Sequence, residues 1–145
     1  MEQGNGFKCE VYFFLSKRLL PAVRLAGEAD ESSRIVNIAS VNGISHPRMN
    51  NYSYSASKAA VIQMTRHMAA DLCPSHININ GIAPGFFPSK ITKHVLAHEQ
   101  EIVKVLPARK IGELAGTAIY FCSCASNCVC GHTVVLDGGQ VANAG

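Results

Sequence analysis

The sequence lacks any long hydrophobic run. No stretch reaches the roughly 18 apolar residues that a membrane-spanning helix needs, and the longest N-terminal run, residues 11–15, is too short for the apolar region of a signal peptide. We therefore expect no membrane partner and take the cytoplasm as the default compartment.

Runs of a single charge are also absent. The 13 basic and 10 acidic residues leave a formal net charge of +3 and are scattered along the chain. A nucleic-acid-binding surface needs clustered positive charge to face the phosphates, so we do not expect nucleic acid as a partner. With 48% hydrophobic and 16% charged residues, the chain has the composition of one globular domain, residues 1–145.

The sequence has little sign of a disulfide framework, because most of its cysteines lie close together. Four of the six fall between positions 122 and 130, where bridges between near neighbours would be strained, so we expect reduced thiols. A zinc quartet of Cys124, Cys128, Cys130 and His132 is an alternative, but its gaps do not follow the usual C-x₂₋₄-C pairs. His94 and His98 share a helical face and have no third ligand, so we expect no metal.

What is present is an alternation of helical and strand-like periodicity. Apolar residues at helical spacing predict helices over 11–25, 53–72, 89–105 and 113–124. Short β-branched or alternating runs predict strands over 34–39, 76–82 and 132–136. This order indicates an α/β fold with a parallel sheet, in which chemistry gathers where strands end. Ser40, Gly85 and Asp137 each stand at such an end.

Tyr54 and Lys58 lie four residues apart near the start of the helix expected over 53–72. Residues at this spacing project from one helix face, although such a pair alone is usually ordinary helix surface. An ammonium near a phenol lowers its pKa from about 10 towards the range that suits acid–base catalysis. Two more signals accompany the pair. Ser40 can donate a hydrogen bond to a carbonyl oxygen, and Pro84-Gly85 lets backbone approach a flat ring.

Four motifs in fixed order resemble the C-terminal, catalytic half of the short-chain dehydrogenase/reductase family, over about residues 12–139. They are IVNIAS at 35–40, YSASKAA at 54–60, NGIAPG at 80–85 and DGG at 137–139. The resemblance implies the C-terminal part of a Rossmann-like, doubly wound parallel sheet, with the N-terminal βαβ units missing.

The resemblance also implies an NAD(P)(H)-dependent oxidoreductase acting on a small-molecule carbonyl or alcohol, with the hydride belonging to the cofactor. Ser40 would orient the substrate oxygen, and Tyr54 would donate or accept the proton. Lys58 would lower the tyrosine pKa and, with Tyr54, contact the nicotinamide ribose. The residues that would line the nicotinamide are Pro84, Gly85 and Ser89.

Two longer segments, residues 65–70 and 84–90, look most like the 3-oxoacyl-[acyl-carrier-protein] reductases linked to rhamnolipid synthesis. This likeness implies β-keto acyl thioester substrates and slightly favours NADP over NAD, although the fold alone fixes neither. Members of the family commonly assemble as dimers and tetramers through the helices that here span 11–25 and 53–72. A homo- or hetero-oligomer is therefore expected.

The sequence departs from the family at three places. No glycine-rich G-x-x-x-G-x-G turn follows a strand, and Gly4 and Gly6 have no strand before them. The asparagine that holds a relay water in the family falls on Lys8, and the loop at 109–116 is several residues short. We therefore expect a truncated chain that binds cofactor poorly and has little activity alone. The alternative is a non-catalytic subunit that pairs with full-length relatives.

Overall fold

The computed structural model describes residues 8–46, 50–87, 102–104 and 106–143. Its elements, in chain order, are α1 (Lys8–Ala26), β1 (Ser33–Ile38), η1 (Val41–Gly43), α2 (Tyr52–Leu72), η2 (Cys73–Ser75), β2 (Ile77–Pro84), α5 (Ala115–Cys122), η3 (Cys124–Ser126) and β3 (Thr133–Leu136).

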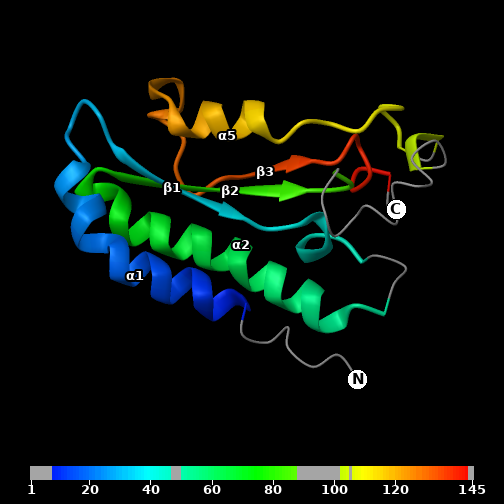
Figure 1. Ribbon diagram of the computed structural model, residues 1–145, viewed down its shortest axis with the longest axis horizontal. Coiled ribbons are helices and arrows are strands. Elements are labelled where there is room, and N and C mark those ends of the chain that lie inside the picture. The colour runs from blue at the N-terminus through cyan, green and yellow to red at the C-terminus, as the bar shows by residue number, and fades with distance from the viewer. Residues whose placement is uncertain (1–7, 47–49, 88–101, 105, 144–145) are drawn as a thin grey trace.

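The described strands form one parallel sheet in the order β1-β2-β3. Helices α1 and α2 cover one face of the sheet, and α5 covers the other (Figure 1). β2 lies in the middle, and three of its side chains, Ile77, Ile79 and Ile82, are completely buried. The asparagines that alternate with them, Asn78 and Asn80, are buried as well and donate hydrogen bonds to backbone carbonyls, so the strand can be covered on both faces. The predicted α/β, doubly wound parallel sheet is confirmed.

The core between the sheet and the two long helices also contains polar side chains with partners. Asn37 of β1 donates from Nδ2 to Oγ1 of Thr65 on α2 at 3.0 Å, and both residues are buried. The Thr65 hydroxyl in turn donates to the Val61 carbonyl at 2.8 Å. Because a buried polar group is costly only when it lacks a partner, this pair holds β1 and α2 in one register.

Helix α1 is longer than predicted and continues through a proline. It begins three residues before the expected start and ends at Ala26, with Pro21 inside it. Proline lacks the N–H that would donate to the carbonyl four residues earlier. The apolar contacts of Leu20 and Val23 with the core hold this part of the helix on the sheet.

The remaining boundaries differ by one to two residues at most ends. β2 runs on through Pro84 because Ala83 and Pro84 still pair with Val135 and Leu136 of β3. α5 is shorter than the predicted 113–124, since its last residues form η3. Of the helix expected over 89–105, residues 102–104 are helical, and the other positions lie outside the described residues.

Candidate active site

Ser40 lies two residues beyond the end of β1, at the carboxyl edge of the sheet. Its backbone is extended, and its side-chain oxygen accepts a hydrogen bond from the Asn42 amide at 3.2 Å, which caps η1. The side chain is 8% exposed. A serine that caps the short helix after a buried strand has its hydroxyl oxygen held in one position.

Lys58 is tied to the same end of β1. Its Nζ donates to the Ile38 carbonyl at 2.8 Å, and the Tyr12 hydroxyl donates to that same carbonyl, also at 2.8 Å. Nζ and the Tyr12 oxygen are themselves 3.4 Å apart. Ile38 is two residues before Ser40, so these contacts fix the ammonium close to the serine-bearing strand end. A charge-assisted bond of this kind is stronger than a neutral one.

The Lys58 ammonium also faces two aromatic rings. Nζ lies 5.7 Å from the centre of the Tyr54 ring and 5.5 Å from that of Tyr12, within the range of cation–π attraction. The structure thus brings Tyr54 and Lys58 to one helix face, as their spacing predicted. Their catalytic roles stay predictions.

Tyr12 is a residue of this site that the sequence analysis missed. It stands in the aromatic run at 12–14, which is typical of core or subunit interface. Its ring does pack against the core, but its hydroxyl reaches the Lys58 ammonium and the end of β1. No local pattern signals this contact, because α1 and α2 meet only in the tertiary fold.

Gly43 is a second residue with an unpredicted role. A Cβ at this position would lie 2.6 Å from the backbone carbon of Lys58 and 2.6 Å from the amide nitrogen of Ala59. Real Cβ atoms essentially never come so close to backbone. Glycine therefore lets η1, which follows Ser40, lie directly on the turn of α2 that carries Lys58.

Gly85 is fixed by the neighbouring strand. Its amide donates to the Leu136 carbonyl at 2.8 Å, and an added Cβ would lie 2.9 Å from the Cβ of Asp137. Close packing against β3 is thus a reason for glycine here, apart from any ligand. The Asp137 carboxylate accepts from the amides of Gly139 at 2.8 Å and Val141 at 2.6 Å, which closes the turn after β3. Ser89 lies outside the described residues.

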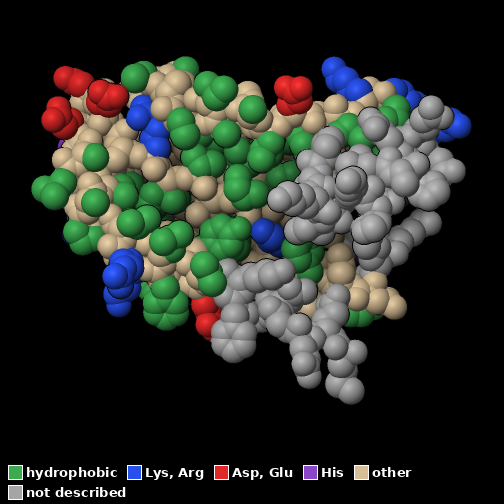
Figure 2. Space-filling model, in the orientation of Figure 1, with side chains coloured by type: hydrophobic (Ala, Val, Ile, Leu, Met, Phe, Trp, Pro, Cys, Tyr) green, Lys and Arg blue, Asp and Glu red, His purple; other side chains and the backbone are tan. Residues whose placement is uncertain are grey.

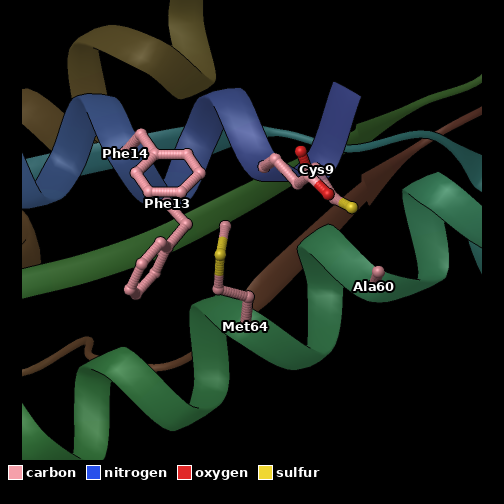
Figure 3. A pocket seen from close by; sticks show the side chains of 6 residues that line it. Cys9, Phe13, Phe14, Ala60 and Met64 are labelled. Atoms are coloured by element: carbon pink, nitrogen blue, oxygen red, sulfur yellow. The ribbon is translucent and has the colours of Figure 1, made fainter. Parts of the chain in front are cut away.

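A hollow of about 410 Å³ lies on the outer side of α1 and α2, away from these groups. In Figure 3 the ring of Phe13 and the side chain of Met64 face each other across it, with Phe14 above and Cys9 and Ala60 towards one end. None of Ser40, Tyr54 and Lys58 lines it. This hollow is therefore separate from the carboxyl edge.

The described residues contain no group of three or more His, Cys, Asp or Glu side chains that could hold a metal ion. Cys124, Cys128, Cys130 and His132 are thus not brought together as a quartet, and His94 and His98 lie outside the described residues. None of the helices in the described part of the chain is long and apolar enough to cross a bilayer.

Comparison with known proteins defines the class. Residues 7–140 match the family described as enoyl-(acyl carrier protein) reductase. The chain belongs to the short-chain dehydrogenase/reductase family of oxidoreductases. The resemblance predicted from the four motifs is confirmed.

Particular relatives show how far the similarity extends. The chain is 37% identical over 134 residues to the rhamnolipids biosynthesis 3-oxoacyl-[acyl-carrier-protein] reductase of Pseudomonas aeruginosa, a match that covers 88% of this chain and 52% of the relative. It is 39% identical over 119 residues to the 2-dehydro-3-deoxy-D-gluconate 5-dehydrogenase of Escherichia coli, covering 75% and 45%. The chain therefore spans about half the length of these curated relatives.

Comparison with solved structures gives the same family and a similar coverage. The Pseudomonas aeruginosa RhlG/NADP active-site complex superposes with a TM-score of 0.84 at 34% identity, over 91% of this chain and 56% of that one. The sheet and helices described above are thus those of the family's Rossmann-like fold.

Proposed function

We propose that Ser40, Tyr54 and Lys58 form the proton-transfer site of an NAD(P)(H)-dependent enzyme that reduces a carbonyl or oxidises an alcohol. The observation that carries the proposal is the Lys58 ammonium, held 2.8 Å from the last carbonyl of β1 and 5.7 Å from the Tyr54 ring. This places a fixed positive charge beside a phenol at the carboxyl edge of a parallel sheet, where such folds bind ligands.

In this proposal the residues divide the work by their chemistry. The Ser40 hydroxyl donates to the substrate carbonyl oxygen and orients it. The Tyr54 hydroxyl gives its proton to that oxygen as negative charge develops there, and takes a proton in the reverse direction. The Lys58 charge stabilises the phenolate that remains. The nicotinamide cofactor, when bound, supplies or accepts the hydride.

The donor groups at this edge fit one end of such a cofactor. An ammonium and a tyrosine hydroxyl suit ribose hydroxyls, so Tyr54 and Lys58 would hold the nicotinamide ribose, and Pro84, Gly85 and Ser89 would line the ring. The buried Gln140 Oε1, which has no hydrogen-bond partner among the described residues, adds an acceptor near Gly85. No glycine-rich turn for the pyrophosphate follows a strand in this sequence.

The choice of NADP is supported by solved structures of relatives in complex with NADP, among them the Pseudomonas complex and a gluconate 5-dehydrogenase from Burkholderia cenocepacia with NADP and tartrate. The relatives point to two substrate classes. One reduces 3-oxoacyl thioesters, and others act on keto-gluconates. We favour the 3-oxoacyl thioester. We also propose the cytoplasm as the compartment, because thiols stay reduced there and none of the six cysteines forms a disulfide in the structure.

The experiment uses a fused protein, because the chain spans about half the length of its relatives. Residues 7–145 are joined behind the N-terminal half of the Pseudomonas reductase, and NADPH oxidation is followed with a 3-oxoacyl thioester and with 5-keto-gluconate. The proposal expects turnover with NADPH, faster than with NADH, on the thioester. A fused protein that melts cooperatively and binds NADPH but turns over neither substrate would overturn it.

A second candidate function is assembly with another chain of the same fold through α1 and α2. Large apolar side chains are exposed along α1, among them Val11 (61%), Phe14 (59%) and Leu15 (54%). Figure 2 shows hydrophobic side chains at the surface over α1, at the lower left of the view. An exposed apolar patch of this kind usually marks an interface. We propose that a second copy covers it.

Light scattering of the purified chain tests the assembly. Phe14→Glu should convert a dimer into a monomer, whereas Ile119→Glu on α5, 68% exposed, should leave the mass unchanged. A monomeric parent chain, or equal effects of the two substitutions, would refute assembly through this face.

A further inference from the structure

Two cysteines from distant parts of the chain meet at the end of α2 that is opposite the candidate active site. Cys73 opens η2, directly after α2, and Cys130 lies in the segment that leads into β3. The two are 57 positions apart in the sequence (130 − 73). Cys130 is half-buried against a core cluster that includes Leu72, the residue before Cys73, and Ile77.

Hydrogen bonds from β2 hold both cysteine-bearing segments. On one side, the Cys73 Sγ lies 3.8 Å from the Oδ1 of Asn78. On the other, Asn80 Nδ2 donates to the Val129 carbonyl at 2.7 Å, and the Gly131 amide donates to the Ile79 carbonyl at 2.7 Å. The residues on both sides of Cys130 are therefore fixed to the central strand, beside the end of α2.

The packing makes the two thiols neighbours, because Cys130 contacts the cluster that contains Leu72, the residue before Cys73. In agreement with this, hydrogen bonding to Cys130 raises the pKa of the Cys73 thiol above its ordinary value, and partial burial and the charge of Cys130 raise it further. By contrast Cys122, Cys124 and Cys128 are exposed.

We propose that Cys73 and Cys130 are a redox modification site, which closes to a disulfide when the protein meets a peroxide or a small-molecule disulfide. With hydrogen peroxide, one thiolate attacks an oxygen, the O–O bond breaks, and a sulfenic acid and water form. The second thiolate then attacks that sulfur, the S–S bond forms, and the hydroxide leaves as water. Two thiols are oxidised, and one peroxide is reduced to two waters.

The disulfide would act on stability and leave the carbonyl chemistry in place. It would join the end of α2 to the start of β3 and restrict the intervening chain in the unfolded state, which raises the melting temperature by roughly 10 °C for a loop of this length. Lys58 and Tyr54 lie near the opposite end of α2. The site is thus independent of the proposed oxidoreductase function.

Peptide mapping of the reduced, purified chain after hydrogen peroxide treatment and thiol blocking tests the proposal. Trypsin leaves Cys73 in residues 67–90 and the four C-terminal cysteines together in 111–145, so fragmentation spectra must assign the partner. The expected result is a dominant Cys73–Cys130 link and a melting temperature higher by roughly 10 °C. The same treatment in concentrated guanidinium chloride should give a mixture of pairs.

Matched variants complete the test. Cys73→Ser and Cys130→Ser should each abolish the rise in melting temperature, whereas Cys128→Ser should retain it. Three results for the peroxide-treated, folded chain would each overturn the proposal. They are links confined to residues 122–130, intermolecular dimers, and a statistical mixture of pairs.

Discussion

Replacing Tyr12 by phenylalanine tests the unexpected part of the candidate active site. The substitution removes the hydroxyl that donates to the Ile38 carbonyl at 2.8 Å and lies 3.4 Å from the Lys58 Nζ. It keeps the ring, and with it the core packing and the ammonium 5.5 Å from the ring centre. Any loss of stability therefore reports on the hydroxyl alone.

The magnitude follows from the two lost contacts. The bond to the Ile38 carbonyl joins neutral groups, and such bonds contribute about 0.5–1.5 kcal/mol. The bond from Lys58 involves a charge, for which about 1.5–3 kcal/mol is typical, but at 3.4 Å it is long. The Ile38 carbonyl keeps its bond from Lys58 at 2.8 Å, so it is not left without a partner. We therefore expect a loss of about 1–2 kcal/mol in the free energy of unfolding.

Urea unfolding measures this loss. With a slope of about 1–3 kcal/mol per molar urea, the midpoint should fall by roughly 0.5–1 M. Tyr52→Phe is the control, because Tyr52 is 80% exposed and its midpoint should match the parent. If the midpoint of Tyr12→Phe equals that of Tyr52→Phe, the hydroxyl does not hold Lys58, and our description of this contact is wrong.

Three further substitutions or reactions check other parts of the structure. Gly43→Ala should cost about 1–3 kcal/mol in a denaturation assay because its Cβ would meet backbone, whereas Gly116→Ala, with nothing within 4 Å, should be neutral or stabilising; equal effects would refute the close approach. Asp137→Ala should cost about 1–3 kcal/mol, seen as a lower melting temperature, since two amides lose their acceptor. Iodoacetamide should label Cys73 more slowly than the exposed Cys128 below pH 9.0, because a raised pKa leaves less thiolate; equal rates would contradict this.

Local patterns in the sequence were sufficient to predict the order of helices and strands. The alternation of isoleucine and asparagine over residues 77–80 indicates a strand, because successive side chains of a strand point to opposite faces. Ends were harder. Pairing with β3 extends β2 through Pro84, and contacts with the core carry α1 past Pro21. Both depend on tertiary partners that no local window contains.

In the candidate active site, too, residues set by local geometry were predicted, and residues set by tertiary contacts were not. Tyr54 and Lys58 were found from their spacing, since helical geometry alone brings them to one face. Tyr12 and Gly43 were missed because their partners lie 46 and about 15 positions away, on α2. The Cys73–Cys130 contact, 57 positions apart, was missed for the same reason.

The most direct test of the central claim is the rate of NADPH oxidation by the fused protein with Tyr54→Phe. Tyr54 is the proposed proton donor, so its loss should lower kcat by at least about 100-fold. The melting temperature should stay close to the parent, and NADPH binding should weaken by no more than the loss of one hydrogen bond to the ribose, roughly tenfold. Tyr52→Phe, two residues away and exposed, should keep the parent rate. A Tyr54→Phe protein that turns over as fast as its Tyr52→Phe control would show that the proton comes from elsewhere.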